Sequence, residues 1–145
     1  MIGLDHIALI VSSEKSLKFY EKLGFKEIKR IERSYDMVIF MGCGQIILEI
    51  FIDPNHPEHI TNPEAKGVRH IAFSVENLEE IMEIVECGEV KTDWFGKRFV
   101  FTKDPDGQPI ELKEINVAVK SAGYNTEDKW VQEYREQFGT EPSFM

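Results

Sequence analysis

Basic residues, cysteines and long apolar runs are all scarce in this 145-residue chain. Lys and Arg number 17 against 26 Asp and Glu, which gives a formal net charge of −9. Nucleic-acid-binding proteins present basic patches, so this balance argues against a nucleic-acid partner. No stretch approaches the ~20 apolar residues of a membrane span. The N-terminus enters a strand-like pattern without the features of a signal peptide, so we expect a cytoplasmic protein with no membrane partner.

The two cysteines, Cys43 and Cys87, are far apart in the sequence and form no Cys-x-x-Cys motif. Cys43 stands between two glycines in an expected hairpin turn, and Cys87 lies beside an expected helix end. Disulfides are rare in a reducing compartment, so we interpret both residues as free thiols. The spacing also shows no Ser-His-Asp or Cys-His arrangement for nucleophilic catalysis.

What the chain does contain is an internal repeat. Residues 4–11 (LDHIALIV) are echoed by residues 68–75 (VRHIAFSV), and each half ends on an apolar-Glu-apolar strand. A repeat of this kind determines the architecture and is therefore interpreted first. It places two histidines, His6 and His70, and two glutamates, Glu49 and Glu111, at equivalent positions.

Each half of the sequence predicts the element order β-α-β-β-β. We expect strands at 4–11, 25–31, 37–41 and 45–52 in the first half, and at 68–75, 90–93, 98–102 and 109–115 in the second. The first helix is expected to begin at an N-cap of Ser12 or Ser13 and to end at Gly24. The second is expected to begin at Asn77 and to end at Gly88. Residues 104–107 (DPDG) predict a tight turn between the last two strands.

These elements predict an α+β fold with two βαβββ modules in tandem within a single domain, residues 1–115. Module one covers residues 1–53, a linker covers 54–66, and module two covers 67–115. Modules of this size would be marginal alone, so we expect a shared core. The tail, residues 116–145, predicts a helix at 126–138 with an aromatic stripe of Trp130, Tyr134 and Phe138. We expect this stripe to dock on the body or on a second subunit, with a lid over the site as the alternative.

Strand alternation separates the histidines from the bulky apolar residues. Ile7, Leu9 and Val11 share one face, which a helix would cover. His6 lies on the opposite face, and the second copy repeats this pattern. Glu49 and Glu111 also point away from their apolar neighbours, toward the side of the histidines. Burial of a carboxylate without a partner is costly, so these glutamates indicate a function.

If the modules pair by a pseudo-twofold axis, two imidazoles and two carboxylates converge. The set is His6, Glu49, His70 and Glu111. Mixed nitrogen and oxygen ligation suits a divalent ion of the Ni²⁺, Co²⁺, Zn²⁺, Fe²⁺ or Mn²⁺ type rather than Ca²⁺. An ion with open coordination positions could bind water or substrate. His56 and His59 lie in a polar loop without repeat partners, and we interpret them as solvated surface residues.

Several segments resemble the glyoxalase I / vicinal oxygen chelate superfamily over about residues 2–115. They are 4–8 (LDHIA), 16–20 (SLKFY), 23–25 (LGF), 67–73 (GVRHIAF) and 103–112 (KDPDGQPIEL). Within the superfamily the set is similar to small bacterial lactoylglutathione lyase-like proteins. The resemblance implies that the two modules curl into one cup around a single metal ion. It also implies that the four repeated residues are the ligands, with Ni, Co or Zn expected first and Fe or Mn as alternatives.

The resemblance further implies a reaction, the isomerisation of the hemithioacetal formed by methylglyoxal and a thiol. A metal-bound glutamate removes a proton beside a carbonyl, and the metal stabilises the enediolate. Glu111 is the first candidate for this base, with Glu49 as its symmetric partner. Glyoxalase I typically has a glutathione-binding arginine on the first strand, whereas the matching position here lies near apolar Ile10, which leaves the thiol open. The candidate substrate-binding cations are Arg33, Lys97 and Arg98.

The same resemblance leaves other functions open. Acyl-CoA epimerases share a similar four-ligand site, and antibiotic-modifying transferases belong to the superfamily. A ring-cleaving dioxygenase would use two histidines and one carboxylate, so Glu49 argues against it. A non-catalytic drug-binding resistance protein generally lacks the ligands, although the acidic charge would favour a cationic drug. We therefore expect a small-molecule partner, and the aromatic tail makes a homodimer the expected assembly.

Overall fold

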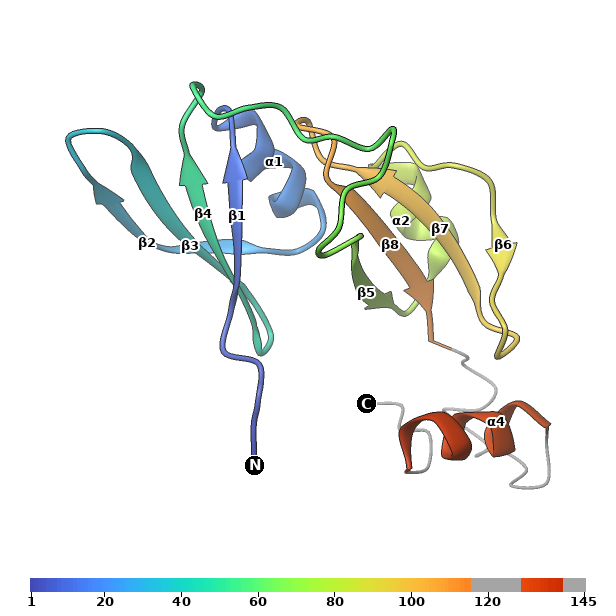
Figure 1. Cartoon of the computed structure of the whole chain (residues 1–145). Helices are drawn as coiled ribbons and strands as arrows, with labels where there is room; N and C mark the ends of the chain where they lie inside the picture. The colour runs from blue at the N-terminus through green and yellow to red at the C-terminus, as the bar shows by residue number, and fades with distance from the viewer. Residues whose placement is uncertain (116–128, 140–145) are drawn as a thin grey trace. The chain divides into compact units, whose positions relative to one another are not determined.

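The computed structural model describes residues 1–115 and 129–139, in which the strands form two four-stranded sheets (Figure 1). The chain divides into two compact units. Unit 1 contains residues 1–67 and 103–108, and unit 2 contains residues 68–102 and those from 109 onward. The predicted α+β fold with tandem βαβββ modules is confirmed. None of the described helices combines the length and apolar character needed to span a membrane.

Unit 1 contains one complete βαβββ module. Its elements are β1 (Ile7–Val11), α1 (Lys15–Lys22), β2 (Lys26–Glu32), β3 (Met37–Cys43) and β4 (Ile46–Ile52). The sheet order is β1-β4-β3-β2, with β1 parallel to β4 and the other neighbours antiparallel. This register sets both Ala8 of β1 and Phe40 of β3 opposite Glu49 of β4.

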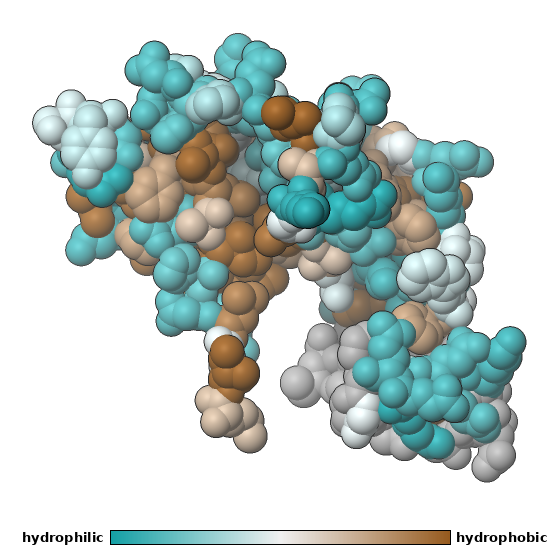
Figure 2. Space-filling model, in the orientation of Figure 1, coloured by the Kyte–Doolittle hydropathy of each residue, from teal (hydrophilic) through white to brown (hydrophobic). Residues whose placement is uncertain are grey.

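The core of unit 1 lies on one face of this sheet. Its strand residues are Leu9, Val11, Ile39, Met41, Leu48 and Ile50, all of them buried. Leu17 and Tyr20 of α1 are buried as well, and the Tyr20 ring packs edge-to-face against Phe25. The residues before β1 are different, because Met1, Ile2 and Leu4 are exposed and form an apolar arm that projects from the unit (Figure 2).

Unit 2 repeats the module and adds a helix from the tail. Its elements are β5 (Ile71–Val75), α2 (Leu78–Ile84), β6 (Lys91–Thr92), β7 (Arg98–Lys103), β8 (Pro109–Glu114) and α4 (Lys129–Phe138). The sheet order β5-β8-β7-β6 matches that of unit 1, and Ala72 of β5 lies opposite Glu111 of β8. The buried apolar residues of these elements are Ile71, Phe73, Leu78, Val100, Ile110, Leu112 and Val131.

Helix α4 docks on unit 2, one of the two positions expected for the tail. The Tyr134 ring packs against the ring of Phe95 at 5.8 Å between centroids, and Val131 is fully buried. The predicted helix began at residue 126, but residues 126–128 lie outside the described part of the chain. The side chains of Trp130 and Phe138, also in the predicted stripe, lie outside it too.

The start of α1 differs from the sequence prediction. Its N-cap residue is Glu14, which makes no side-chain capping bond, so the prediction of Ser12 or Ser13 as the cap was wrong. Instead, the Asp106 carboxylate accepts hydrogen bonds from the Ser12 backbone N–H at 3.0 Å and from the Ser16 hydroxyl at 2.9 Å. The Ser12 hydroxyl donates to the same carboxylate. The Ser13 hydroxyl still accepts the N–H of Lys15, the first residue of α1, at 3.3 Å. A turn 90 residues away in the sequence therefore fixes the start of α1 through Ser12 and Ser16, in addition to this local bond.

Asp104 provides the second attachment of the same turn. The Tyr20 hydroxyl donates to Asp104 Oδ2 at 2.8 Å, and the two residues are only 0% and 3% exposed. Asp104 Oδ1 accepts the backbone N–H groups of Asp106 and Gln108. Burial, aided by the Asp104 charge, raises the pKa of Tyr20, so its hydroxyl remains a donor. The buried acid is thus fully hydrogen-bonded, as a buried polar group requires.

Helix α2 is shorter than predicted. Asn77 caps it as expected, accepting the Glu80 N–H at 3.1 Å. The helix ends at Ile84, however, because Val85 is extended and buried, so the prediction of Gly88 as its end was wrong. The Gly88 N–H instead donates to the carbonyl of Phe101 in β7. Burial of Val85 and pairing with the sheet therefore replace the last expected helical turn.

Arg98 connects β7 to the start of α2. Its guanidinium donates to both oxygens of Glu114, at 3.1 and 2.8 Å, and pairs with Glu79 of α2 at 2.8 Å. Glu114 in turn accepts the N–H of Leu78 at the first position of the helix. The hydrogen bond from Arg98 lowers the pKa of Glu114. Arg98 therefore supports a carboxylate that satisfies the N-terminus of α2.

We expect Asp106→Ala to lower the free energy of unfolding by about 1–2 kcal/mol, because the Ser12 N–H and the Ser12 and Ser16 hydroxyls at the start of α1 lose their acceptor. Burial alone would raise the pKa of this carboxyl, but the bonds from Ser12 and Ser16 bring it below its ordinary 3.8. A lowered pKa means that the stabilisation is complete above 3.8 and is lost as the pH falls through the lowered value. Urea unfolding along a descending pH series, with Glu21→Ala as control, checks this. A difference from wild type that persists unchanged in acid would contradict it.

We expect Arg98→Ala to lower the melting temperature, because Glu114 loses its charged partner beside α2. The matched control is Lys91→Ala, an exposed cation in the same unit. Thermal unfolding followed by circular dichroism measures the difference between the two variants. Equal melting temperatures for both variants would show that the Arg98 network contributes nothing.

Candidate functional site

In each sheet, one face carries the core and the opposite face carries the predicted ligands. Leu48 and Ile50 are fully buried, so Glu49 between them points to the other side. Ile110 and Leu112 flank Glu111 in the same way. We call the face that carries Glu49 in unit 1, or Glu111 in unit 2, the ligand face.

The unit 1 pair consists of His6, which directly precedes β1, and Glu49. The His6 Nε2 lies 3.0 Å from Glu49 Oε2, and the Nδ1 lies 2.7 Å from Asp5 Oδ2. The hydrogen bond to Asp5, with a further contribution from the Glu49 charge, raises the pKa of His6 although burial opposes it. Two carboxylates thus flank one imidazole, so a positive species, either a proton or a metal ion, is favoured at Nε2.

This arrangement fits a metal ion. Ligand bonds of ~2.1 Å place neighbouring ligand atoms about 3 Å apart, as the His6 Nε2 and Glu49 Oε2 are. Asp5 holds the second ring nitrogen, as outer carboxylates commonly do for metal-binding histidines. The position of Asp5 directly before His6 is the one signal of this role that the sequence offers.

The unit 2 pair consists of His70, directly before β5, and Glu111. The His70 Nε2 lies 3.8 Å from Glu111 Oε2. Its Nδ1 is buried and has no hydrogen-bond partner among the described residues. The Phe101 ring packs edge-to-face against the imidazole at 5.0 Å. The orientation of His70 is therefore set by packing, whereas that of His6 is set by a carboxylate.

Each unit brings together half of the predicted ligand set. Within the described residues, no group of three or more His, Cys, Asp and Glu side chains is placed to hold a metal ion. His6 with Glu49 and His70 with Glu111 are instead two matching pairs, each an imidazole beside a carboxylate. The convergence of both pairs on one ion stays a prediction.

A pocket of about 500 Å³ lies on the ligand face of unit 1. It is lined by Ala8, Ile10, Arg33, Tyr35, Asp36, Phe51, Asp53 and His56. Phe51 follows Glu49 by two residues on the same face of β4, so the pocket adjoins the His6–Glu49 pair. Arg33 of this set was predicted from the sequence, whereas Tyr35 and Phe51 were not, because they carry no spacing signal.

Arg33 forms a fixed cationic wall of this pocket. Its Nε and Nη2 donate to the two oxygens of Asp36, both at 2.6 Å. Its guanidinium carbon lies 4.6 Å from the Tyr35 ring centroid and 5.4 Å from that of Phe51. The bonds to Asp36 raise the pKa of Arg33 and lower that of Asp36. The pocket therefore presents a planar, permanently charged group against two aromatic rings.

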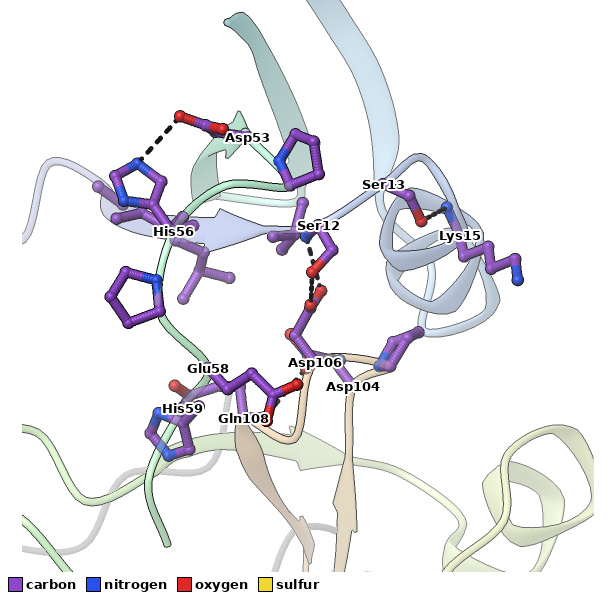
Figure 3. Close-up of a pocket in the computed structure, with 17 residues that line it drawn as sticks. Ser12, Ser13, Lys15, Asp53, His56, Glu58, His59, Asp104, Asp106 and Gln108 are labelled. Carbon is purple, nitrogen blue, oxygen red and sulfur yellow. Dashed lines mark hydrogen bonds and ion pairs between the residues drawn. The ribbon is translucent and has the colours of Figure 1, made fainter.

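A second pocket of unit 1, about 790 Å³ in volume, is more polar (Figure 3). Ser12, Asp106 and Gln108 line one side, and His56, Glu58 and His59 come from the linker. His56 pairs with Asp53 at 3.5 Å, while both linker histidines are exposed. The exposure agrees with their interpretation as surface residues, and the Ser12–Asp106 bonds give this wall a structural role.

The unit 2 cations predicted to bind substrate lie in different environments. Arg98 shares the core face with buried Val100 and is engaged by α2, so it points away from the ligand face. Lys97 is half-buried, and burial, together with the nearby Lys113 charge, lowers its pKa. Lys113 follows Glu111 by two residues and therefore lies on the ligand face. Lys113 was not among the predicted residues, although strand alternation places it on the same face as Glu111.

Comparison with known proteins places this geometry in a family. Residues 3–112 match the model of the Glyoxalase/Bleomycin resistance protein/Dioxygenase superfamily. The uncharacterized protein YwkD of Bacillus subtilis (strain 168) is 42% identical, over 77% of this chain and 96% of the relative.

Two solved structures agree with this placement. The glyoxalase family protein from Enterococcus faecalis superposes with a TM-score of 0.71 at 36% identity, covering 77% of this chain and 97% of that one. The fosfomycin resistance protein FosX of Listeria monocytogenes gives 0.63 at 25% identity, covering 78% and 94%. With its tandem modules and family match, the chain belongs to the glyoxalase/bleomycin resistance/dioxygenase superfamily.

Proposed function

We propose that this protein is a metal-dependent lyase or isomerase of the glyoxalase I type. Its substrate would be the hemithioacetal of an α-oxoaldehyde such as methylglyoxal, and the reaction would begin with proton abstraction. The observation that supports this most directly is the pair of His–Glu contacts, 3.0 and 3.8 Å long, repeated on the ligand faces of both units. Members of this superfamily typically use a divalent metal ion.

The residues that would hold the ion are His6, Glu49, His70 and Glu111. Their two imidazoles and two carboxylates favour Ni²⁺, Co²⁺ or Zn²⁺, with Fe²⁺ or Mn²⁺ as alternatives. When bound, such an ion would act as a Lewis acid that stabilises the negative charge developing on the substrate oxygens. Asp5 would keep the His6 ring oriented through Nδ1.

Glu111 is the residue we propose as the base. Its carboxylate would accept the proton from the carbon beside the carbonyl and return it to the neighbouring carbon. The Glu111 side chain is 13% exposed, against 20% for Glu49, so water has less access to it. Phe101, packed against His70, adds apolar surface beside this pair. Glu49 would be the symmetric partner of Glu111.

The substrate would be oriented by the unit 1 pocket. Arg33, fixed by Asp36 and the two rings, would bind an anionic or carbonyl oxygen without reorganising. Lys97 stays a candidate for the same purpose in unit 2. For Arg98, the contacts with α2 favour a structural role instead.

An acyl-CoA epimerase or another enzyme of the superfamily would use the same four ligands. A drug-binding resistance protein would need none of them, so metal dependence distinguishes it from the enzymes. Superfamily members are commonly dimeric and bind small molecules. We infer a homodimer here too, in which the exposed apolar arm of Met1, Ile2 and Leu4 would become covered.

The metal site is tested by removing one imidazole from each unit. We expect His6→Ala and His70→Ala each to weaken Ni²⁺ or Zn²⁺ binding at least ~100-fold, more than the loss of an outer-shell partner. Isothermal titration calorimetry, with elemental analysis of the untagged protein, measures affinity and stoichiometry. His59→Ala, in the exposed linker, is the control and should bind like wild type. Unchanged affinity in His70→Ala would exclude the four-ligand site.

The role of Glu111 is tested by an isosteric change. We expect Glu111→Gln to reduce kcat at least ~100-fold with methylglyoxal hemithioacetals, because the amide accepts no proton. Several thiols should be compared, since the sequence does not identify the thiol that forms the hemithioacetal. Glu58→Gln, an exposed carboxylate of the linker, is the matched control. Full turnover by Glu111→Gln would assign the base elsewhere, and absence of turnover in metal-loaded wild type with every thiol would reject the proposed reaction.

A further inference from the structure

The two ligand faces are equivalent in backbone but differ in chemistry. Glu49 and Glu111 occupy the same repeat position in β4 and β8. Two residues further along these strands lie Phe51 in unit 1 and Lys113 in unit 2. Residues two apart in a strand point to the same face. The face beside the glutamate therefore continues into an aromatic ring in one unit and into an ammonium group in the other.

The neighbouring first strands show the same difference. Ile10 pairs in register with Phe51, and Ser74 pairs in register with Lys113. Ile10 is 55% exposed, so unit 1 presents open apolar surface at this position. Unit 2 presents a hydroxyl and an ammonium at the equivalent position. The repeat thus preserves the His–Glu pairs and changes the residues beside them, so the two ligand faces would recognise different chemical groups.

Lys113 is held in place by a buried acid. Its Nζ lies 2.8 Å from Asp93 Oδ2, and the Asp93 side chain is only 11% exposed. The other Asp93 oxygen accepts the backbone N–H groups of Phe95 and Lys97, both at 2.9 Å. The ammonium carries three N–H groups, and Asp93 lies beside it as an ion-pair partner, so donors remain for a ligand. The Lys113 side chain is 31% exposed and is therefore accessible.

The ion pair is not needed to shape the loop before β7. That loop closes through its own backbone, with the Asp93 N–H donating to the Lys97 carbonyl at 2.8 Å and the Gly96 N–H to the Asp93 carbonyl at 3.1 Å. Asp93 also orders the loop through the two N–H groups it accepts. The contact between Asp93 and Lys113 therefore serves to orient the lysine side chain on the ligand face. A residue that binds a ligand needs such a fixed orientation.

We propose that Lys113 is a specificity-determining residue that binds a carboxylate group of the substrate. The inference rests on the proposed function, which places the reacting carbon of the substrate beside Glu111. Two residues along a strand span about 6.6 Å. The substrate class is therefore an α-oxoaldehyde adduct, or a related carbonyl compound, with a carboxylate a few bonds from the carbonyl.

The experiment uses a matched pair of probes, 4-oxopentanoate and its methyl ester, which differ only in the charge at one end. Ligand-observed NMR titrations give the dissociation constant of each for the full chain, both metal-free and zinc-loaded. We expect wild type to bind the acid at least roughly tenfold more tightly than the ester. Lys113→Met should abolish this preference, and Lys113→Arg should retain it. Lys18→Met, an exposed lysine of α1, removes the same charge elsewhere and should behave like wild type.

Each outcome decides the proposal. A preference that disappears only in Lys113→Met supports it. An equal preference in Lys113→Met and wild type, or no preference in wild type, including failure to bind either probe, overturns it. Circular dichroism confirms that the variants fold, and Lys113→Arg retains the charge should the methionine variant unfold. A preference in the metal-free protein without any isomerase activity would support the Lys113 site while rejecting the proposed reaction, so the two failures are distinguishable.

Discussion

The alternation of side chains along the strands is the constraint on which the site depends. In β4 and β8 the residues on either side of the glutamate are completely buried, so the backbone places each carboxylate opposite the core. A slip of one residue in register would bury Glu49 and expose Leu48, at the cost of an unpaired buried charge. The hydrophobic core and the proposed metal ligands therefore specify each other. Loss of packing on one face would displace the chemistry on the opposite face.

Much of the fold could be predicted because its signals are local. Alternating apolar residues identified the strands, the repeated histidine segments identified the two modules, and Asn77 identified the start of α2. The start of α1 lies at Glu14, one residue beyond the predicted serines, in a segment that Asp106 of a distant turn holds through Ser12. The end of α2 was also missed, because burial of Val85 outweighs the signal of Gly88. Both helix boundaries were wrongly predicted at a place where a tertiary contact, invisible in the local sequence, helps to set the end of the helix.

The candidate site was predictable to the same extent. The repeat indicated both His–Glu pairs, and the structure finds an imidazole beside a carboxylate in each unit. It did not indicate the surroundings, since Tyr35 and Phe51 meet Arg33 only through the folding of the β2–β3 region. Arg98 was selected for its charge, but strand parity assigns it to the core face. The sequence thus identified candidate substrate-binding cations by their charge alone. The face of the strand on which a cation lies then shows whether it can reach the ligand face.

The turn at residues 103–108 gives the chain an architecture that differs from its repeat. By sequence the turn belongs to the second half, yet it is part of unit 1, where Tyr20, Ser12 and Ser16 bind its two acids. The boundary of the sequence repeat and the boundary between the compact units therefore do not coincide. A ribosome that has synthesised only the first half has made a module whose Tyr20 hydroxyl still lacks its acceptor. Completion of the first unit has to await synthesis of residues 103–108, which lie near the end of the second module.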